Sequence, residues 1–453
     1  MSSPLAAALW TADANETLRL SLIRAKEDED SISPEEAYHL FHPTFTYPVF
    51  GDDQKIYGYK NLEIDLKFAS ASLTPYLKIS YSERLPQSAA VDDPEKALRE
   101  HLLPPDYYTD EAEFLKRVEE EATTFKPFGE LIHTYTRDVN HAVRVETGSD
   151  DSWDDRKKPE ASSSKTPEPP APMEIVQYEI YRVAWRDTPE FKEYLRRMQP
   201  FILLYIEGGS KLNEDEEEWE FFVLYEKRQR KRSPGVWTYH FVGYSSLFPF
   251  YCYPEKIRLR ISQFVILPPY QQEGHGSALY NAIYRYVLSQ PHIAELTVED
   301  PAEAFEDLRD RNDLQMLLNH EEFMRSALGE ELTGAAGGVG PVRNHGVNGV
   351  KKRGKSMGKL GPPTDKAWLA KWNSELKIAK RQFHRLIEML MLKYIDQTDP
   401  LILKAYRLQV KDRLYRFNFE LLMQLDKRER MAKLEETFQA VKKDYVRILN
   451  MIH

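Results

Sequence analysis

Cysteine is almost absent from this chain of 453 residues, which contains only Cys252. A single thiol excludes an internal disulfide framework and a zinc site built on several cysteines, and we expect no metal. No apolar run approaches the ~20 residues that a membrane-spanning helix needs. The N-terminal residues 1–6 lack a basic stretch followed by a long apolar core, so no secretory signal is evident. These absences favour a protein of the cytoplasm and the nucleus, with no membrane contact.

Excess positive charge is also missing, because the formal net charge is −10. This balance argues against a general nucleic-acid binder and suits a protein whose substrate is a basic peptide. The acidic run 214–218 is best interpreted as a solvated loop, and steering of a lysine-rich tail is the alternative. With 42% hydrophobic and 12% aromatic residues, most of the chain is expected to be globular.

A turn that contains two glycines, residues 271–277, is the most informative motif. The run 260–267 predicts a strand that stops at Pro268 and Pro269, and apolar residues recur at helical spacing over 278–287. Glycines let backbone N–H groups approach a ligand, and a helix N-terminus adds unpaired donors and partial positive charge. The turn is therefore typical of an anion site, although glycines at a helix start can also serve only packing or capping.

A second strand-to-helix junction carries adjacent carboxylates. The apolar run 293–298 ends at Glu299, Asp300 and Pro301, and a helix is expected to continue through Leu308. Carboxylates at the end of a strand are suited to proton transfer at the edge of a sheet. Asp300 could instead cap the helix, and both roles are compatible if Glu299 is the catalytic group.

These motifs together resemble the type B histone acetyltransferase catalytic subunits of the GNAT superfamily. In GNAT enzymes the pattern Q-x-x-G-x-G, present at 271–276, binds the pyrophosphate of acetyl-CoA. The likeness runs in family order from about Thr17 to His320. It is carried by residues 50–53, 125–129, 242–244, 253–254 and 296–311. After Pro363 the chain resembles the family only in being helical.

The resemblance implies an α+β fold: a GNAT mixed sheet flanked by helices, with an N-terminal α/β region and a C-terminal helical bundle. It implies transfer of the acetyl group of acetyl-CoA to lysines of free, newly made histone H4 tails, by direct attack in a ternary complex. A WD-repeat histone-binding subunit is the expected partner, without direct nucleic-acid contact. The alternatives are a GNAT enzyme for another protein or amine and an inactive histone chaperone or scaffold.

The resemblance also assigns residues. Glu299 is the expected base, with Asp300 and Glu207 as supporting or alternative proton acceptors. The coenzyme is expected to contact Phe264, Val265, Ile266, Gln271, Gln272, Glu273, Gly274, His275, Gly276, Ser277 and Arg311. A side-chain contact at Ala302, where the family often has a polar residue, is not expected. The histone tail is expected to meet Asp52, Asp53, Gln54, Trp219, Phe248, Pro249 and Phe250, although these aromatic residues could equally be core.

Composition and periodicity divide the chain into five segments. They are an N-terminal α/β region (1–147), a linker rich in Asp, Pro and Ser (148–172), the catalytic domain (173–328), a Gly-rich basic linker (329–363) and a helical bundle (364–453). Strands are expected at 17–22, 62–68, 77–81, 173–183, 219–227, 236–246 and 258–267. Helices are expected at 94–102, at 110–121 and from an N-cap at Thr188, and three more are expected in the bundle.

Two further features are interpreted conservatively. Residues 349–356 fit the Walker A pattern, but no apolar strand precedes them and no long helix follows, so a basic linker or an import signal at 351–353 is favoured over ATP binding. Cys252 could form an acetyl-cysteine intermediate. Its apolar neighbours favour a buried packing residue instead.

Overall fold

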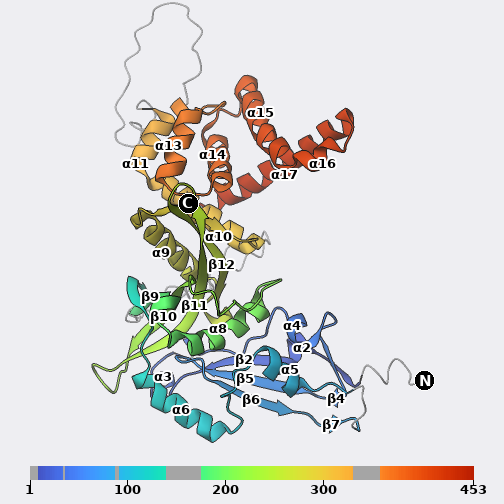
Figure 1. The fold of residues 1–453 in the computed structure, drawn as a ribbon, viewed down its shortest axis with the longest axis vertical. Helices are drawn as coiled ribbons and strands as arrows, with labels where there is room; N and C mark the ends of the chain where they lie inside the picture. Colours follow the sequence, from blue (N-terminus) through green and yellow to red (C-terminus); the bar gives the residue numbers. More distant parts are fainter. Residues whose placement is uncertain (1–8, 34–35, 87–90, 139–174, 330–357, 453) are drawn as a thin grey trace, which may run out of the picture. The chain divides into compact units, whose positions relative to one another are not determined.

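The structure is a computed structural model that describes residues 9–33, 36–86, 91–138, 175–329 and 358–452. The chain divides into two compact units (Figure 1). The first unit comprises residues 1–249 and 261–283, and the second unit comprises residues 250–260 and 284–453. The five segment boundaries expected from the sequence stay predictions, and the expected linker 148–172 lies outside the described residues.

A three-stranded sheet organises the N-terminal part of the first unit. Strand β2 (Leu18–Ile23) pairs in parallel with β5 (Glu63–Ala69), which pairs antiparallel with β6 (Pro75–Ser80). Leu18, Leu20 and Leu22 are buried, as the alternating pattern predicts. This part also contains two small antiparallel pairs, β1 (Thr11–Asp13) with β3 (Lys55–Tyr57) and β4 (Tyr59–Lys60) with β7 (Glu83–Arg84). It has three short helices as well: α2 (Ala14–Thr17), α3 (Lys26–Glu29) and α4 (Tyr47–Phe50).

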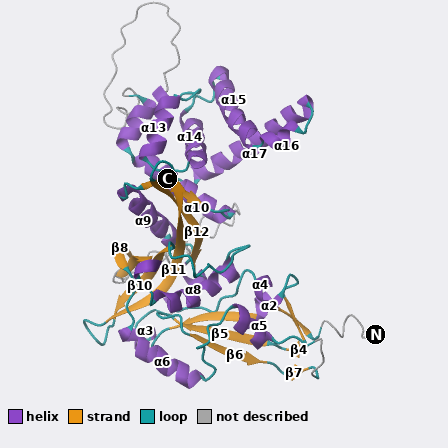
Figure 2. Cartoon of the chain, in the orientation of Figure 1, coloured by secondary structure: helices purple, strands orange, loops and turns teal. Residues whose placement is uncertain are grey.

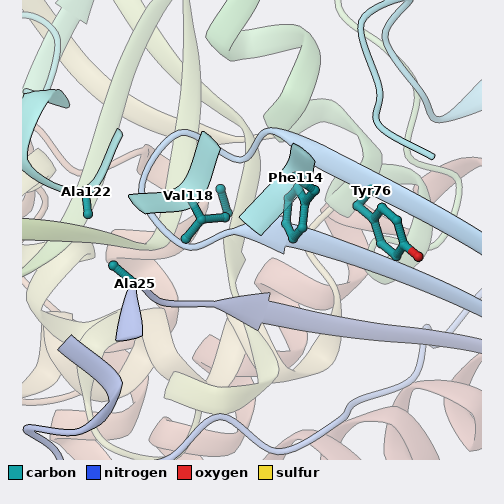
Figure 3. Close-up of a cluster of buried hydrophobic side chains, with 6 residues drawn as sticks. Ala25, Tyr76, Phe114, Val118 and Ala122 are labelled. Atoms are coloured by element: carbon teal, nitrogen blue, oxygen red, sulfur yellow. The ribbon is translucent and has the colours of Figure 1, made fainter. Parts of the chain in front are cut away.

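Two longer helices of this region confirm the sequence expectation. They are α5 (Pro94–His101) and α6 (Glu111–Thr124), and the side chain of Asp110 caps α6 by accepting from the backbone N–H of Glu113. Helix α6 buries Phe114, Val118 and Ala122, spaced four residues apart, so that they lie on one face. Figure 3 shows this cluster, which Ala25, Ala69 and Tyr76 complete.

The main sheet has six strands in the order β13-β12-β11-β10-β9-β8. The strands β8 to β11 pair antiparallel. In chain order the strands are β8 (Glu130–Asp138), β9 (Ile175–Ala184), β10 (Glu220–Gln229), β11 (Trp237–Cys252), β12 (Lys256–Ile266) and β13 (Ile293–Val298). Helix α8 (Phe191–Tyr205) packs aromatic rings against β10 and β11. The ring centroids of Phe191 and Phe221 are 5.1 Å apart, and those of Phe201 and Phe241 are 6.1 Å apart. Helix α9 (His275–Ser289) connects β12 to β13.

The second unit is mainly helical (Figure 2). Its helices are α10 (Glu303–Asn319), α11 (Glu321–Leu328), α13 (Lys366–Glu375), α14 (Lys380–Tyr394), α15 (Pro400–Phe417), α16 (Phe419–Met423) and α17 (Lys427–Asn450). Arg385 of α14 joins α10 to α17, because it bonds Asp310 at 2.8 Å and Asp444 at 2.6 Å. Helices that follow β13 therefore share one compact unit with the C-terminal helices. None of the described helices combines the length and apolar character of a membrane span.

Several helix boundaries differ from the sequence expectation. The first C-terminal helix is two helices, α13 and α14, because the backbone between them pairs with β13. Leu296 N donates to Lys377 O at 2.9 Å, and Leu296 forms a parallel bridge with Ile378. Lys377 adopts a φ of 50°, which a helix does not allow. Helix α8 has Glu190, not Thr188, as its N-cap.

The end of the expected second linker includes a described turn. Residues 330–357, which contain the Walker A pattern, lie outside the described residues. Residues 358–360 form a 3₁₀ turn whose Leu360 is fully buried. An apolar side chain at the end of the basic segment therefore belongs to the packed helical unit, which composition alone did not reveal.

Candidate active site

The glycine turn, residues Gln271–Ser277, connects β12 to α9 as the sequence predicts. A 3₁₀ turn over Pro268–Tyr270 follows β12, and α9 begins at His275. The Gln271 side chain donates to Ile266 O at 2.8 Å and ties the turn back to the strand. Gly274 has a φ of 77°, which a side chain rarely tolerates, and a Cβ there would collide with the Arg137 guanidinium. The turn thus places small residues and backbone donors at a helix start.

His275 fixes the turn from its buried side. Its Nδ1 lies 2.7 Å from Tyr135 Oη, and its Nε2 lies 3.2 Å from Glu273 Oε2. Burial lowers the pKa of His275, the nearby Arg137 lowers it further, and Glu273 opposes this shift. The imidazole is therefore a neutral anchor inside the fold, so His275 can serve a ligand through its backbone only.

A buried polar network supports the residue before the turn. Tyr270 donates to Glu226 Oε2 at 2.7 Å, and Arg24 bonds the same oxygen at 2.9 Å. Tyr38 bonds Tyr270, and the Arg24 guanidinium lies 4.3 Å from the Tyr38 ring centre. Burial alone would raise the pKa of Glu226, but Arg24 and Arg228 outweigh it and hold that pKa well below its usual range. The Glu226 carboxylate therefore stays ionised, and it links Arg24 of the N-terminal region to Tyr270, the residue before the turn.

The expected pantetheine strand is the end of β12. Val265 and Ile266 are buried, and Phe264 is half-buried. Leu267 N donates to Val242 O at 2.9 Å, so β11 flanks this stretch. A Cβ at Gly243 would collide with Val265 O. Glycine at 243 therefore permits the close approach of the two backbones.

In the second unit, Glu299 and Asp300 follow the last residue of β13, and both side chains are exposed. The N-cap of α10 is Ala302, which makes no side-chain cap. The alternative role of Asp300 as a cap of this helix is therefore wrong, because the helix starts only after Pro301 and Ala302. Asp300 instead adopts a φ of 30°, a left-handed conformation that Asp tolerates better than most residues. Arg311 is exposed on α10.

The other expected acidic residues belong to the first unit. Glu207 is exposed just after Ile206, the C-cap of α8. Asp52 and Asp53 are exposed in the turn after α4. Gln54 is already engaged, since its Oε1 accepts from Thr46 N at 2.9 Å and from Asn15 Nδ2 at 3.2 Å. The two aspartates can meet a basic ligand, whereas Gln54 organises their turn.

The expected aromatic contacts separate into core and surface. Trp219 is only 8% exposed and packs edge-on against Phe248 at 4.8 Å, while its Nε1 donates to Glu216. Phe250 is 37% exposed and lies 4.3 Å from the Arg260 guanidinium. Pro249 is half-buried. Trp219 is therefore mainly a packing residue, and Phe250 is the more accessible ring.

Cys252 is not the buried residue that its apolar neighbours suggested. Its side chain is half-buried, and the adjacent Tyr251 and Tyr253 are 73% and 85% exposed. Residues 250–253 lie where β11 ends and the chain turns into β12. Their side chains are apolar although they are not buried in the core.

Sequence reasoning missed one strand that reaches the glycine turn. Strand β8 carries Tyr135, the partner of His275, and Arg137, whose guanidinium lies against Gly274. The signal was present, because residues 131–136 are rich in β-branched and aromatic residues.

A cavity of about 240 Å³ in the first unit contains none of the expected site residues. Its lining includes Lys227, Arg228 and Trp237. Lys227 bonds Glu179 at 2.7 Å, and Arg228 pairs with Glu36 and Glu226. Lys227 and Arg228 are therefore neutralised by carboxylates, and Lys231, which also lines the cavity, donates to Ser31 O. Among the described residues no group of acidic, histidine or cysteine side chains has the arrangement of a metal site.

Comparisons with known proteins agree with this architecture. Three family models match: "Histone acetyl transferase HAT1 N-terminus" over residues 10–207, "Acetyltransferase (GNAT) family" over 178–306 and "Fungal HAT1, C-terminal" over 353–396. A histone acetyltransferase type B catalytic subunit from Cryptococcus neoformans is 46% identical over 444 residues, which cover 98% of each chain. The proteins of the same name from Mycosarcoma maydis and Kluyveromyces lactis are 39% and 32% identical, over 96% and 98% of this chain and 87% and 93% of theirs.

These matches correct one sequence interpretation. The likeness does not stop at Pro363, because the alignments cover nearly the whole chain and one family model spans residues 353–396. The sequences of helices α13 and α14 are therefore similar to those of the relatives, and the likeness is not limited to their being helical.

Proposed function

Because this chain belongs to the family of type B histone acetyltransferase catalytic subunits, we propose that it acetylates lysines on the tail of free, newly made histone H4. It is an acetyltransferase of the GNAT class with a histone as its substrate class. The choice of H4, the assignment of residues and the order of steps are our proposals.

The observation that carries this proposal is the glycine turn at the start of α9. Gly274 accepts a left-handed φ, and Gly276 lies in the first turn of the helix, where side chains would cover the N–H groups. The diphosphate of acetyl-CoA would bind these donors. The backbone of Phe264, Val265 and Ile266 would hold the pantetheine arm as an added strand, and Arg311 would lie near the coenzyme.

Proton removal is the second requirement. A lysine ammonium has no lone pair, so a base must take its proton before nitrogen attacks the thioester carbonyl. Glu299, exposed at the end of β13, is our candidate. The C–N bond then forms, the C–S bond breaks, and the nitrogen loses its second proton, which the departing coenzyme thiolate takes up. Asp300 and Glu207 are supporting or alternative acceptors.

Charge favours a basic substrate. The net charge is −10, and Asp52 and Asp53 are exposed carboxylates that a lysine-rich tail would meet. Phe250 offers an accessible ring for the aliphatic part of such a tail. We further propose a WD-repeat histone-binding partner and a location in cytoplasm and nucleus, where newly made histones are available.

The experiment is a panel of histone tail peptides, incubated with the full chain and acetyl-CoA and read by mass spectrometry. We expect the H4 peptide to be acetylated fastest. Initial-rate patterns that intersect indicate a ternary complex, whereas parallel patterns indicate a covalent acetyl-enzyme. Cys252→Ala should retain activity.

Preference for another histone would contradict the H4 assignment. Absence of acetyl transfer together with normal acetyl-CoA binding would favour an inactive scaffold.

A further inference from the structure

Arg137 of strand β8 is a charged side chain that lies against Gly274 of the glycine turn. It lies one residue before the end of β8, next to Val176 of β9. Its Cζ would be 3.4 Å from a Cβ built on Gly274, and its Nη2 would collide with that atom. The guanidinium therefore lies against the space that the missing glycine side chain leaves open.

The hydrogen-bonding capacity of this arginine is not used up. In the part of the chain that the structure describes, Arg137 Nε is buried without a hydrogen-bond partner, and no ion pair involves its guanidinium. The arginines of the neighbouring network differ in being ion-paired, since Arg24 pairs with Glu226 and Arg228 pairs with Glu36, although Arg24 Nε and Nη1 are also buried without a hydrogen-bond partner among the described residues. A buried guanidinium nitrogen without an acceptor is costly, so an anion at this place would relieve the cost.

The turn itself lacks positive charge. Residues 271–277 contain no lysine or arginine, and the one histidine is buried and kept neutral. Backbone N–H groups alone would have to hold a diphosphate that carries two negative charges. An arginine fork beside them would add charge-assisted bonds of the geometry that phosphate oxygens prefer.

Tyr135 and Arg137 act on the turn from the same strand. They are two residues apart on β8, which places them on the same face, and Tyr135 holds His275 at 2.7 Å. Strand β8 thus contributes one side chain that fixes the first residue of α9 and one that faces the glycine before it.

We propose that Arg137 binds the pyrophosphate of acetyl-CoA with its guanidinium, beside the backbone donors of the glycine turn. The inference rests on the proposed function, since it names a further residue for the same coenzyme. It assigns to β8 a direct role in coenzyme binding that the Q-x-x-G-x-G pattern does not contain.

The test is calorimetric binding of acetyl-CoA and of its 3′-dephospho analogue to the full chain. In Arg137→Gln we expect both ligands to bind about 10- to 100-fold more weakly, the range for loss of hydrogen bonds to a charged group. Arg137→Lys should recover part of the loss, because it keeps the charge without the fork. Arg186→Gln, an exposed arginine of the first unit, is the matched control and should bind like the wild type.

The outcomes separate cleanly. Unchanged affinity of Arg137→Gln for both ligands overturns the inference, and so does a loss confined to the ligand that carries the 3′-phosphate. Thermal unfolding without ligand checks that the variants fold, and Arg137→Lys supplies the comparison if Arg137→Gln does not. Failure of the wild type to bind acetyl-CoA would instead refute the proposed function.

Discussion

Two strand-to-helix junctions of this protein are built in opposite ways. At the glycine turn, the flanking side chains Tyr270, Gln271 and His275 are bonded to the fold, and the backbone is left to serve a ligand. At the carboxylate junction, Glu299 and Asp300 are exposed, and the helix start has no side-chain cap.

The difference follows from the two tasks. Backbone donors bind an anion well only if the chain cannot relax away, so the turn needs buried support. A base must exchange protons with solvent between turnovers, so its carboxylate has to stay accessible. The following variants test whether the glycine turn depends on its buried support and whether the exposed carboxylates supply the base.

Glu299→Gln should have the largest effect. It keeps the shape of the side chain but cannot accept a proton, so we expect turnover to fall by roughly two to four orders of magnitude at neutral pH. Affinity for acetyl-CoA should be nearly unchanged, and a higher pH should restore part of the rate, because more of the substrate amine is then neutral. A pH–rate profile measures both. Near-normal turnover, with the loss in Glu207→Gln or Asp300→Asn instead, would show that the base is misassigned.

Arg24→Met tests the support beneath the glycine turn. The substitution removes one partner of the buried Glu226. We expect the free energy of unfolding to fall by about 3 kcal/mol. This is the lower end of the range for a broken buried ion pair, because Arg228 still pairs with Glu226. Glu226 has a depressed pKa in the folded chain, so its stabilisation is present above the unfolded pKa of about 4.3 and is lost as pH falls below it.

Denaturant unfolding at pH 7 and near pH 3.5, below the unfolded pKa, measures both parts of this prediction. The variant's deficit should shrink at the lower pH, since the carboxylate without Arg24 is protonated more readily. Equal deficits at both pH values would contradict the role given to Glu226. Arg232→Met, at an exposed arginine 3.7 Å from Asp30, is the control and should cost little.

Gly276→Glu tests the backbone donors directly. A side chain, and a negative one, in the first turn of α9 should block the pyrophosphate while the fold survives, so the Michaelis constant for acetyl-CoA should rise about 10- to 100-fold. Steady-state kinetics at saturating peptide measures it. An unchanged coenzyme affinity is incompatible with the assignment of the turn.

Asp300→Asn should have the smallest effect. Asp300 does not cap α10, and Asn tolerates a left-handed φ as well as Asp does, so stability should change little. We expect turnover to fall by less than about tenfold if Asp300 only supports Glu299. A drop as large as that of Glu299→Gln would make Asp300 the base.

Local sequence information was sufficient where neighbours along the chain determine structure. Strand β13, α5 and the β12-turn-α9 junction were predicted, because period, glycine and proline act within a few residues. Prediction failed where distant residues compete. The expected helix through residues 376–379 is interrupted by pairing with Leu296, and residues 250–253 look like core although they end a strand.

The sequence by itself determined the family, the GNAT class of fold and the two motifs proposed for coenzyme and base, since each is a short pattern with its own physical meaning. Only the tertiary structure decided that His275 faces inward to Tyr135, that Glu226 is held ionised by Arg24 and that Arg137 lies against Gly274. These contacts join residues that are 137 to 202 positions apart. No periodic pattern encodes such pairings, because they arise only when the strands are assembled into a sheet.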